Sequence, residues 1–150
     1  NGFSLVRNIL SKKKSSFVTA KIKKELIKPT KIYVKELNQI NKKGLIKACA
    51  NITGGGLLNN LIRVVPNTLS INIDLSKIKI KPIFKWLKKN NIKDTEMLNT
   101  FNCGVGFCLI TEKGNINRIK NIFSNEYKPY EIGVISKKRD KINTFGKLEW

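Results

Sequence analysis

The chain has 150 residues, enough for one domain with a sizeable core, and no apolar run approaches the roughly 18 residues that a membrane span needs. Its net charge is +20, but 26 of the 30 basic residues are lysines, which are spread along the chain and not interleaved with aromatic residues. We therefore expect a solvated surface with no specific nucleic-acid partner, whose positive field would favour anionic small molecules such as nucleotides. With neither an initiating Met nor a signal-peptide pattern, residues 1–150 are expected to be one domain of a longer cytoplasmic protein.

Helical and strand-like patterns alternate along the chain. Apolar residues at helical spacing, and alternating or continuous apolar runs, predict the elements in this order: helix 3–13, polar loop 12–16, helix 33–44, strand 45–52, helix 57–65, strand 69–73, helices 82–87 and 94–101, strand 105–111, helix 116–123, and strands 131–136 and 147–150. Thr30 is the expected N-cap of the second helix. Together these elements predict one α+β domain with a mixed sheet.

Three consecutive glycines follow the first predicted strand, in the run Ile52-Thr53-Gly54-Gly55-Gly56. Because glycines cost conformational entropy, such a run indicates unusual backbone angles or a close backbone approach. At the start of a helix, the exposed N–H groups and the positive helix end can bind an anion. A tight turn that binds nothing explains the pattern equally well, and the sequence that follows is not that of a P-loop. Thr53 and the three glycines are candidate phosphate-binding residues.

A second turn with glycines, Phe101-Asn102-Cys103-Gly104-Val105-Gly106, lies between a predicted helix and a predicted strand. Asn102 could hydrogen-bond a ligand, although a turn with a close backbone crossing is the interpretation that these residues favour. Cys103 has no His or flanking Lys that would lower its pKa, so we do not expect a nucleophile there. The chain contains no His, its three cysteines lack paired spacing, and its carboxylates form no pair, so no metal ligand and no catalytic residue is assigned.

Five ordered motifs resemble those of the phosphoribosylaminoimidazole synthetase family, the phosphoribosylformylglycinamidine cyclo-ligases. They are Asn1–Arg7 (NGFSLVR), Pro29–Lys35 (PTKIYVK), Ile52–Gly56 (ITGGG), Arg63–Pro66 (RVVP) and Glu96–Gly106 (EMLNTFNCGVG). The likeness extends from the first residue to about Ser136. Two positions depart from the family pattern: Asn51 replaces the usual His, and Lys31 the usual Arg. Because an Asn cannot supply a proton near neutral pH, position 51 is better suited to positioning than to acid–base chemistry.

The resemblance implies a three-layer α/β/α domain with a mixed sheet, forming the C-terminal half of the enzyme. It also implies a reaction of purine synthesis, in which ATP activates the formyl oxygen of formylglycinamidine ribonucleotide and an amidine nitrogen closes the imidazole ring. ATP and Mg²⁺ would bind mainly with the N-terminal domain, the expected partner in a homodimeric enzyme. The implied substrate- and phosphate-binding residues are Asn1, Gly2, Thr53, Gly54, Gly55, Gly56 and Asn102.

Two alternatives remain open at this point. The first is another ATP-dependent synthetase of the same superfamily with a different substrate. The second is a basic nucleic-acid-binding module that uses the lysine-rich surface, for which steep salt dependence of DNA binding would be the distinguishing property.

Overall fold

The computed structural model describes residues 2–12, 18–137 and 140–150. Its α-helices are α1 (Phe3–Lys12), α2 (Ala20–Leu26), α3 (Val34–Lys42), α4 (Gly56–Ile62), α5 (Pro82–Lys88), α6 (Asp94–Thr100) and α7 (Ile116–Lys120). Its strands are β1 (Ala48–Asn51), β2 (Leu69–Asp74), β3 (Phe107–Ile110), β4 (Gly133–Lys137) and β5 (Ile142–Phe145). Three short 3-10 turns, η2 (Leu75–Lys77), η3 (Lys113–Asn115) and η4 (Asn125–Tyr127), complete the described elements.

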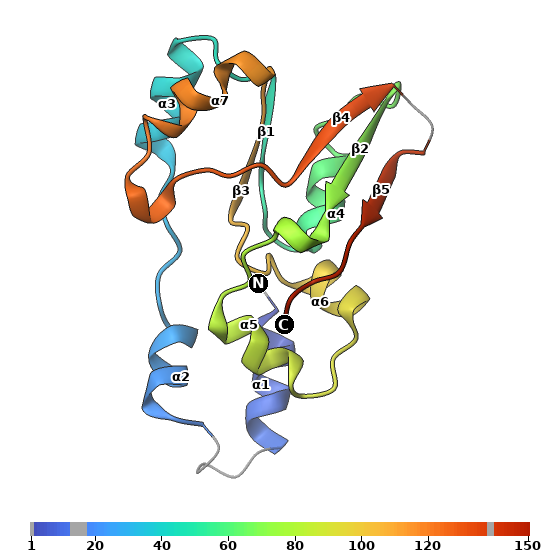
Figure 1. Ribbon diagram of the computed structural model, residues 1–150. Coiled ribbons are helices and arrows are strands. Elements are labelled where there is room, and N and C mark those ends of the chain that lie inside the picture. Colours follow the sequence, from blue (N-terminus) through green and yellow to red (C-terminus); the bar gives the residue numbers. More distant parts are fainter. Residues whose placement is uncertain (1, 13–17, 138–139) are drawn as a thin grey trace.

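The molecule has a sheet-containing part and a helical part (Figure 1). Strands β1 and β3 form an antiparallel pair, while β2 lies between β4 and β5 in a mixed sheet, antiparallel to the first and parallel to the second. This confirms the α+β class with a mixed sheet. The strands are divided between two sheets and not joined in one, a division that no local sequence pattern specifies.

Helices lie on both sides of the β1–β3 pair. Ile40 of α3, Ile119 of α7 and Leu109 of β3 share one small apolar cluster on one face. On the other face, one large cluster joins β1 and β3 with α4 and β2, through residues such as Leu57 and Ile73. The layers of helix, sheet and helix agree with the three-layer prediction, and the three-stranded sheet packs beside them.

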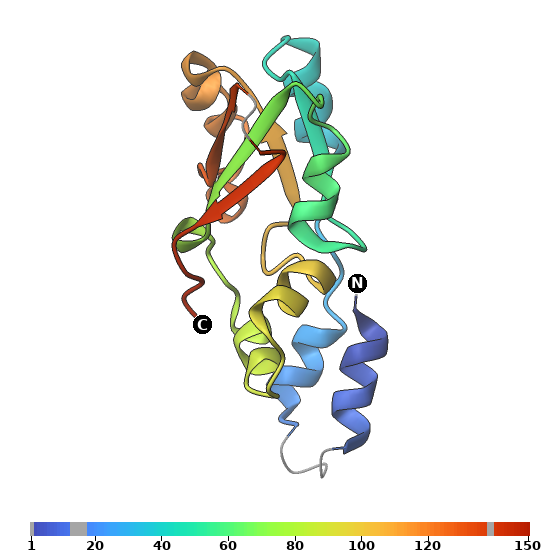
Figure 2. The same cartoon turned by 90° about the vertical axis from the view of Figure 1, so that its right-hand side faces the viewer.

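The helical part consists of α1, α2, α5 and α6, which lie together below the sheets in both views (Figures 1 and 2). Its buried cluster contains Val6 and Ile9 of α1, Leu87 of α5, Met97 of α6 and Phe101. Helix α2 contributes no buried residue, and only its partly buried Leu26 packs against this cluster. Among the residues that the structure describes, no helix is long and apolar enough to cross a membrane.

The region before Val34 differs from the sequence predictions in two respects. Helix α2 was not foreseen, because its seven residues present no buried stripe. The N-cap of α3 is Tyr33 and not Thr30, because tertiary contacts of Lys31 and Tyr33 keep the chain out of the helix until Val34. The predicted loop over 12–16 lies mostly outside the described residues.

The last strand runs over Ile142–Phe145 and not over 147–150. Gly146 ends it with φ +71°, and a Cβ there would approach Asp74 Oδ1 at 2.7 Å. The apolar residues that suggested a strand pack individually instead. Leu148 is buried in the large cluster, and Trp150 donates its indole N–H to Asp94 at 3.0 Å.

Candidate functional site

The glycine turn connects the end of β1 to the start of α4. Gly55 is the N-cap of α4 with φ +92°, and Gly56 follows with φ +66°, so both occupy the left-handed region that favours glycine. At Gly56 a Cβ would lie 1.8 Å from the carbonyl oxygen of Leu98. Gly56 is therefore a packing contact between α4 and α6, and a ligand has no access to it.

Gly54 has a different environment. It is exposed, its φ is not left-handed, and a Cβ placed on it would meet nothing within 4 Å. Thr53 is also exposed. Within the described part of the chain, the N–H groups of Gly54 and Gly55 donate to no protein acceptor, whereas that of Gly56 donates to Thr53 O at 3.1 Å. The open side of the turn thus presents free donors to an incoming group.

The side chain of Asn60 fixes the shape of this turn. Its buried Nδ2 donates to the carbonyl oxygens of Gly56 at 2.7 Å, Gly54 at 3.2 Å and Thr53 at 3.4 Å. Because the amide holds the carbonyls inward, it preorganises the turn without occupying its outer side. Asn60 is not among the residues predicted from sequence; its signal was a polar residue between Leu57 and Leu61 on the apolar face of the predicted helix.

The other predicted site residues that the structure describes, Gly2 and Asn102, lie at the C-terminal end of α6, the helix that also packs against Gly56. A Cβ on Gly2, whose φ is +74°, would clash with the ring of Phe101 at 2.3 Å, so the start of α1 lies against the end of α6. Asn102 uses its Oδ1 to accept the N–H of Gly104 at 3.0 Å. Asn102 thus stabilises its own turn, in line with the favoured interpretation. Asn1 lies outside the described residues.

A half-buried ion pair anchors the connection between α2 and α3. Lys31 Nζ lies 2.7 Å from Glu36 Oε1 and 4.4 Å from the centroid of the Tyr127 ring. The hydrogen bond between Lys31 and Glu36 lowers the pKa of Glu36 and raises the pKa of Lys31. The Lys31 charge is therefore fixed in place, which ties the connection to η4.

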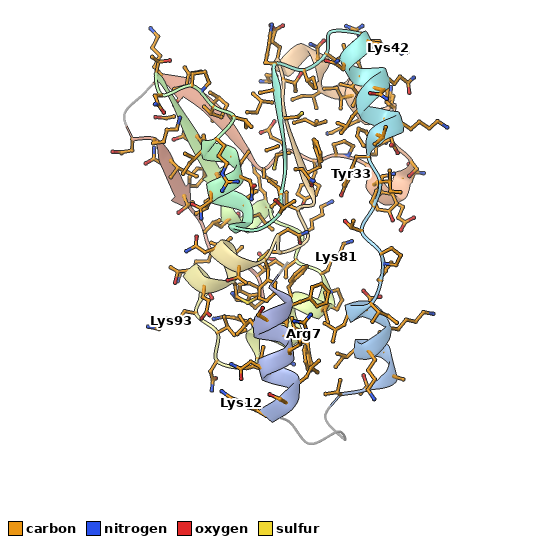
Figure 3. All side chains as sticks on the ribbon, turned by 180° about the vertical axis from the view of Figure 1, so that it is seen from behind. Arg7, Lys12, Tyr33, Lys42, Lys81 and Lys93 are labelled. Atoms are coloured by element: carbon orange, nitrogen blue, oxygen red, sulfur yellow. The ribbon has the colours of Figure 1, made fainter. Side chains whose placement is uncertain are left out.

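Tyr33 holds the same connection against the start of β3, near the glycine turn. Its ring lies 5.2 Å from that of Phe107, and its hydroxyl is so close to Gly106 that a Cβ there would approach it at 2.3 Å. The carbonyl of Gly106 in turn accepts the N–H of Ile52 at 3.1 Å. Tyr33, labelled in Figure 3, thereby packs beside the strand end from which the turn begins.

Two of the three thiols are buried, and the described residues hold no cluster of metal-ligating side chains. Burial raises the pKa of the Cys103 and Cys108 thiols to about 12, so they stay protonated at neutral pH. Within residues 2–12, 18–137 and 140–150, no three His, Cys, Asp or Glu side chains come together as metal ligands. The turn suits an anion, and it does not suit a cation.

The positive charge is distributed over the whole molecule. Figure 3 shows Lys42 on α3 at one end and Lys12 on α1 at the other, with Lys81 and Lys93 between them. Where acidic partners are near, lysines form separate pairs, such as Lys47 with Glu112 at 2.9 Å. This arrangement agrees with a solvated lysine-rich surface.

Comparisons with known proteins agree with this description. The family described as "AIR synthase related protein, C-terminal domain" matches residues 1–144. The phosphoribosylformylglycinamidine cyclo-ligase of Streptococcus pneumoniae is 39% identical over 147 residues, which cover 94% of this chain but 43% of that enzyme. The trifunctional purine biosynthetic protein adenosine-3 of Chironomus tentans is 50% identical over 90 residues, 59% of this chain and 7% of that protein. The chain thus belongs to the AIR synthase related family and corresponds to its C-terminal domain.

Proposed function

We propose that the chain is the C-terminal half of a cyclo-ligase that converts formylglycinamidine ribonucleotide to aminoimidazole ribonucleotide. The observation that carries this proposal is the open glycine turn, a preorganised anion site within a domain that is 39% identical to the pneumococcal cyclo-ligase. The chain spans less than half the length of that relative. The whole reaction therefore requires a second half.

In this proposal the glycine turn binds a phosphate oxygen of the ribonucleotide. The N–H groups of Gly54 and Gly55 donate to the phosphate, and the exposed Thr53 precedes them in the turn. Asn60 keeps the turn in this shape, so little reorganisation is needed when the anion binds. Gly2 and Asn102 hold the adjoining segments in place, and Asn1, outside the described residues, is proposed as a further substrate-binding residue.

The reaction proceeds in two steps. The γ-phosphoryl group of ATP passes to the formyl oxygen of the substrate and ADP leaves; the amidine nitrogen then attacks the activated carbon, and phosphate leaves as the ring closes. Because the described residues form no cluster of carboxylates, Mg²⁺ and the phosphates of ATP bind mainly to the N-terminal half. This chain contributes substrate binding and orientation, which lower the barrier by positioning.

We further propose a cytoplasmic homodimer.

The test compares this chain, the N-terminal half and the complete enzyme, after circular dichroism has verified that each is folded. We expect ATP-dependent aminoimidazole ribonucleotide from the complete enzyme, partial activity from the mixed halves, and none from this chain alone. Robust turnover by the 150 residues alone would overturn the division of labour.

A further inference from the structure

The connection between α2 and α3 exposes an unusual concentration of large apolar side chains. Ile27, Ile32 and Val34 are 81%, 77% and 60% exposed, and they lie within eight residues. Single exposed apolar residues are ordinary, whereas such groups are typical of surfaces that contact another protein. We call Ile27, Ile32 and Val34 the connection patch.

The exposure of the patch is not the result of a detached segment. Between these residues, Lys31 is held by Glu36 and Tyr127, and Tyr33 is packed against Phe107 and Gly106. The polar and aromatic side chains thus face inward, while the aliphatic ones face out. At a free surface, charged side chains usually face solvent and aliphatic ones face inward, which is the opposite arrangement. The contacts of Lys31 and Tyr33 hold the connection patch in a defined position.

The surroundings of the patch also lack cover. Helix α2, which precedes it, buries none of its residues, and it lies at the side of the helical part in Figure 1. Exposed lysines, among them Lys28 and Lys35, flank the aliphatic side chains. A complementary partner would therefore present an apolar centre with carboxylates around it, the arrangement of a core and a polar rim.

The patch is connected to the candidate site through Tyr33. The hydroxyl of Tyr33 lies against Gly106, and Gly106 O accepts the N–H of Ile52, which immediately precedes Thr53. Tyr33 thus links the connection to the strand end that leads into the glycine turn. More than half of the pneumococcal cyclo-ligase lies outside the region that matches this chain, so a body of sufficient size is available.

From these observations we infer that the connection patch is the surface on which the N-terminal half of the same enzyme docks. The inference rests on the proposed function, because it takes that half as the partner. Docking there would cover the aliphatic side chains and α2 together.

The test is hydroxyl-radical footprinting of the complete enzyme, read residue by residue by mass spectrometry. Val134 on β4 is the internal control, because its exposure of 59% matches the 60% of Val34. After correction for intrinsic reactivity, we expect the modification rates of Ile27, Ile32 and Val34 to be at least about fivefold lower than that of Val134. Side chains in the core of an interface are covered by the partner and react slowly for that reason. Equal modification rates would overturn the inference.

Two further measurements separate the possible occupants and the proposed function. Protection that disappears on dilution, together with a change in oligomeric state in sedimentation, would assign the patch to a second copy and overturn the inference. Ile32→Ser is expected to restore modification of Ile27 and lower turnover, whereas Val134→Ser should do neither. An enzyme that protects the patch but makes no imidazole product would sustain the docking surface while refuting the proposed function.

Discussion

Two glycines of the same turn are expected to respond oppositely to substitution by alanine. At Gly54 the new Cβ meets nothing within 4 Å and φ is not left-handed. The folded state should therefore tolerate Gly54→Ala, with a change of about 1 kcal/mol or less in the free energy of unfolding. At Gly56 the new Cβ would approach Leu98 O at 1.8 Å with φ at +66°.

The cost at Gly56 can be estimated from those two features. A left-handed residue other than glycine costs about 1–2 kcal/mol, and the overpacking against Leu98 costs about 1–3 kcal/mol. The sum, about 2–5 kcal/mol, corresponds to a fall in Tm of about 5–20 °C for a domain of this size. Gly56→Ala should thus destabilise the protein, whatever the turn binds.

Gly54→Ala, which should leave stability nearly unchanged, is the substitution expected to lower activity specifically. A methyl group at Gly54 would stand where the phosphate approaches, and the loss of one hydrogen bond to a charged group is worth about 1.5–3 kcal/mol. We expect Gly54→Ala to lower kcat/KM by about 10- to 100-fold, at unchanged Tm, in the complete enzyme. Steady-state kinetics and differential scanning calorimetry measure both quantities. Normal kinetics in Gly54→Ala would refute phosphate binding by the turn.

Three other predictions follow from the environment of single groups. Lys31→Met should lower the free energy of unfolding at pH 7, because it leaves Glu36 without its partner. Lys31→Arg keeps a positive charge beside Glu36 and should leave the stability nearly unchanged. The pKa of Glu36 is lowered from 4.5, so this contribution is present above about pH 4.5 and is lost as the pH falls through the folded-state pKa. The urea midpoints of wild type and Lys31→Met should therefore converge as the pH falls through that pKa. In native protein at pH 8, iodoacetamide should label the half-exposed Cys49 and spare Cys103 and Cys108, whose thiols have pKa values of about 12; rapid labelling of all three would contradict their burial. Binding to duplex DNA should weaken steeply towards about 0.15 M salt, since exposed charges are then screened beyond about 8 Å. Salt-resistant or sequence-selective binding in fluorescence anisotropy would instead indicate an organised nucleic-acid site.

Most elements could be predicted because their signals are local. The apolar stripe of α1 predicts the buried Val6 and Ile9, and the alternation along β2 predicts the buried Ile71 and Ile73. It does not predict the burial of Ser70 on the opposite face of β2. Helix α2 has no buried face, so it gave no such signal. The chain end over 147–150 was mistaken for a strand because Leu148 and Trp150 are apolar; their burial depends on contacts with distant elements, which periodicity does not record.

The candidate site was only partly predictable for a related reason. Consecutive glycines indicate an unusual backbone, but they do not say which glycine packs against protein and which is open. That division depends on α6, which places Leu98 over Gly56 and leaves Gly54 free. The role of Asn60 likewise requires three carbonyls to converge on one amide, a condition that only the folded turn satisfies.

The most direct test of the central claim is the stoichiometry of the complete enzyme acting on formylglycinamidine ribonucleotide. Aminoimidazole ribonucleotide, ADP and phosphate should be quantified in one reaction, with and without ATP. If this chain is the substrate-binding half of a cyclo-ligase, the three products should appear in equal amounts, and no imidazole should form without ATP. Imidazole formation without ATP, or hydrolysis of ATP with no imidazole product, would contradict the assignment.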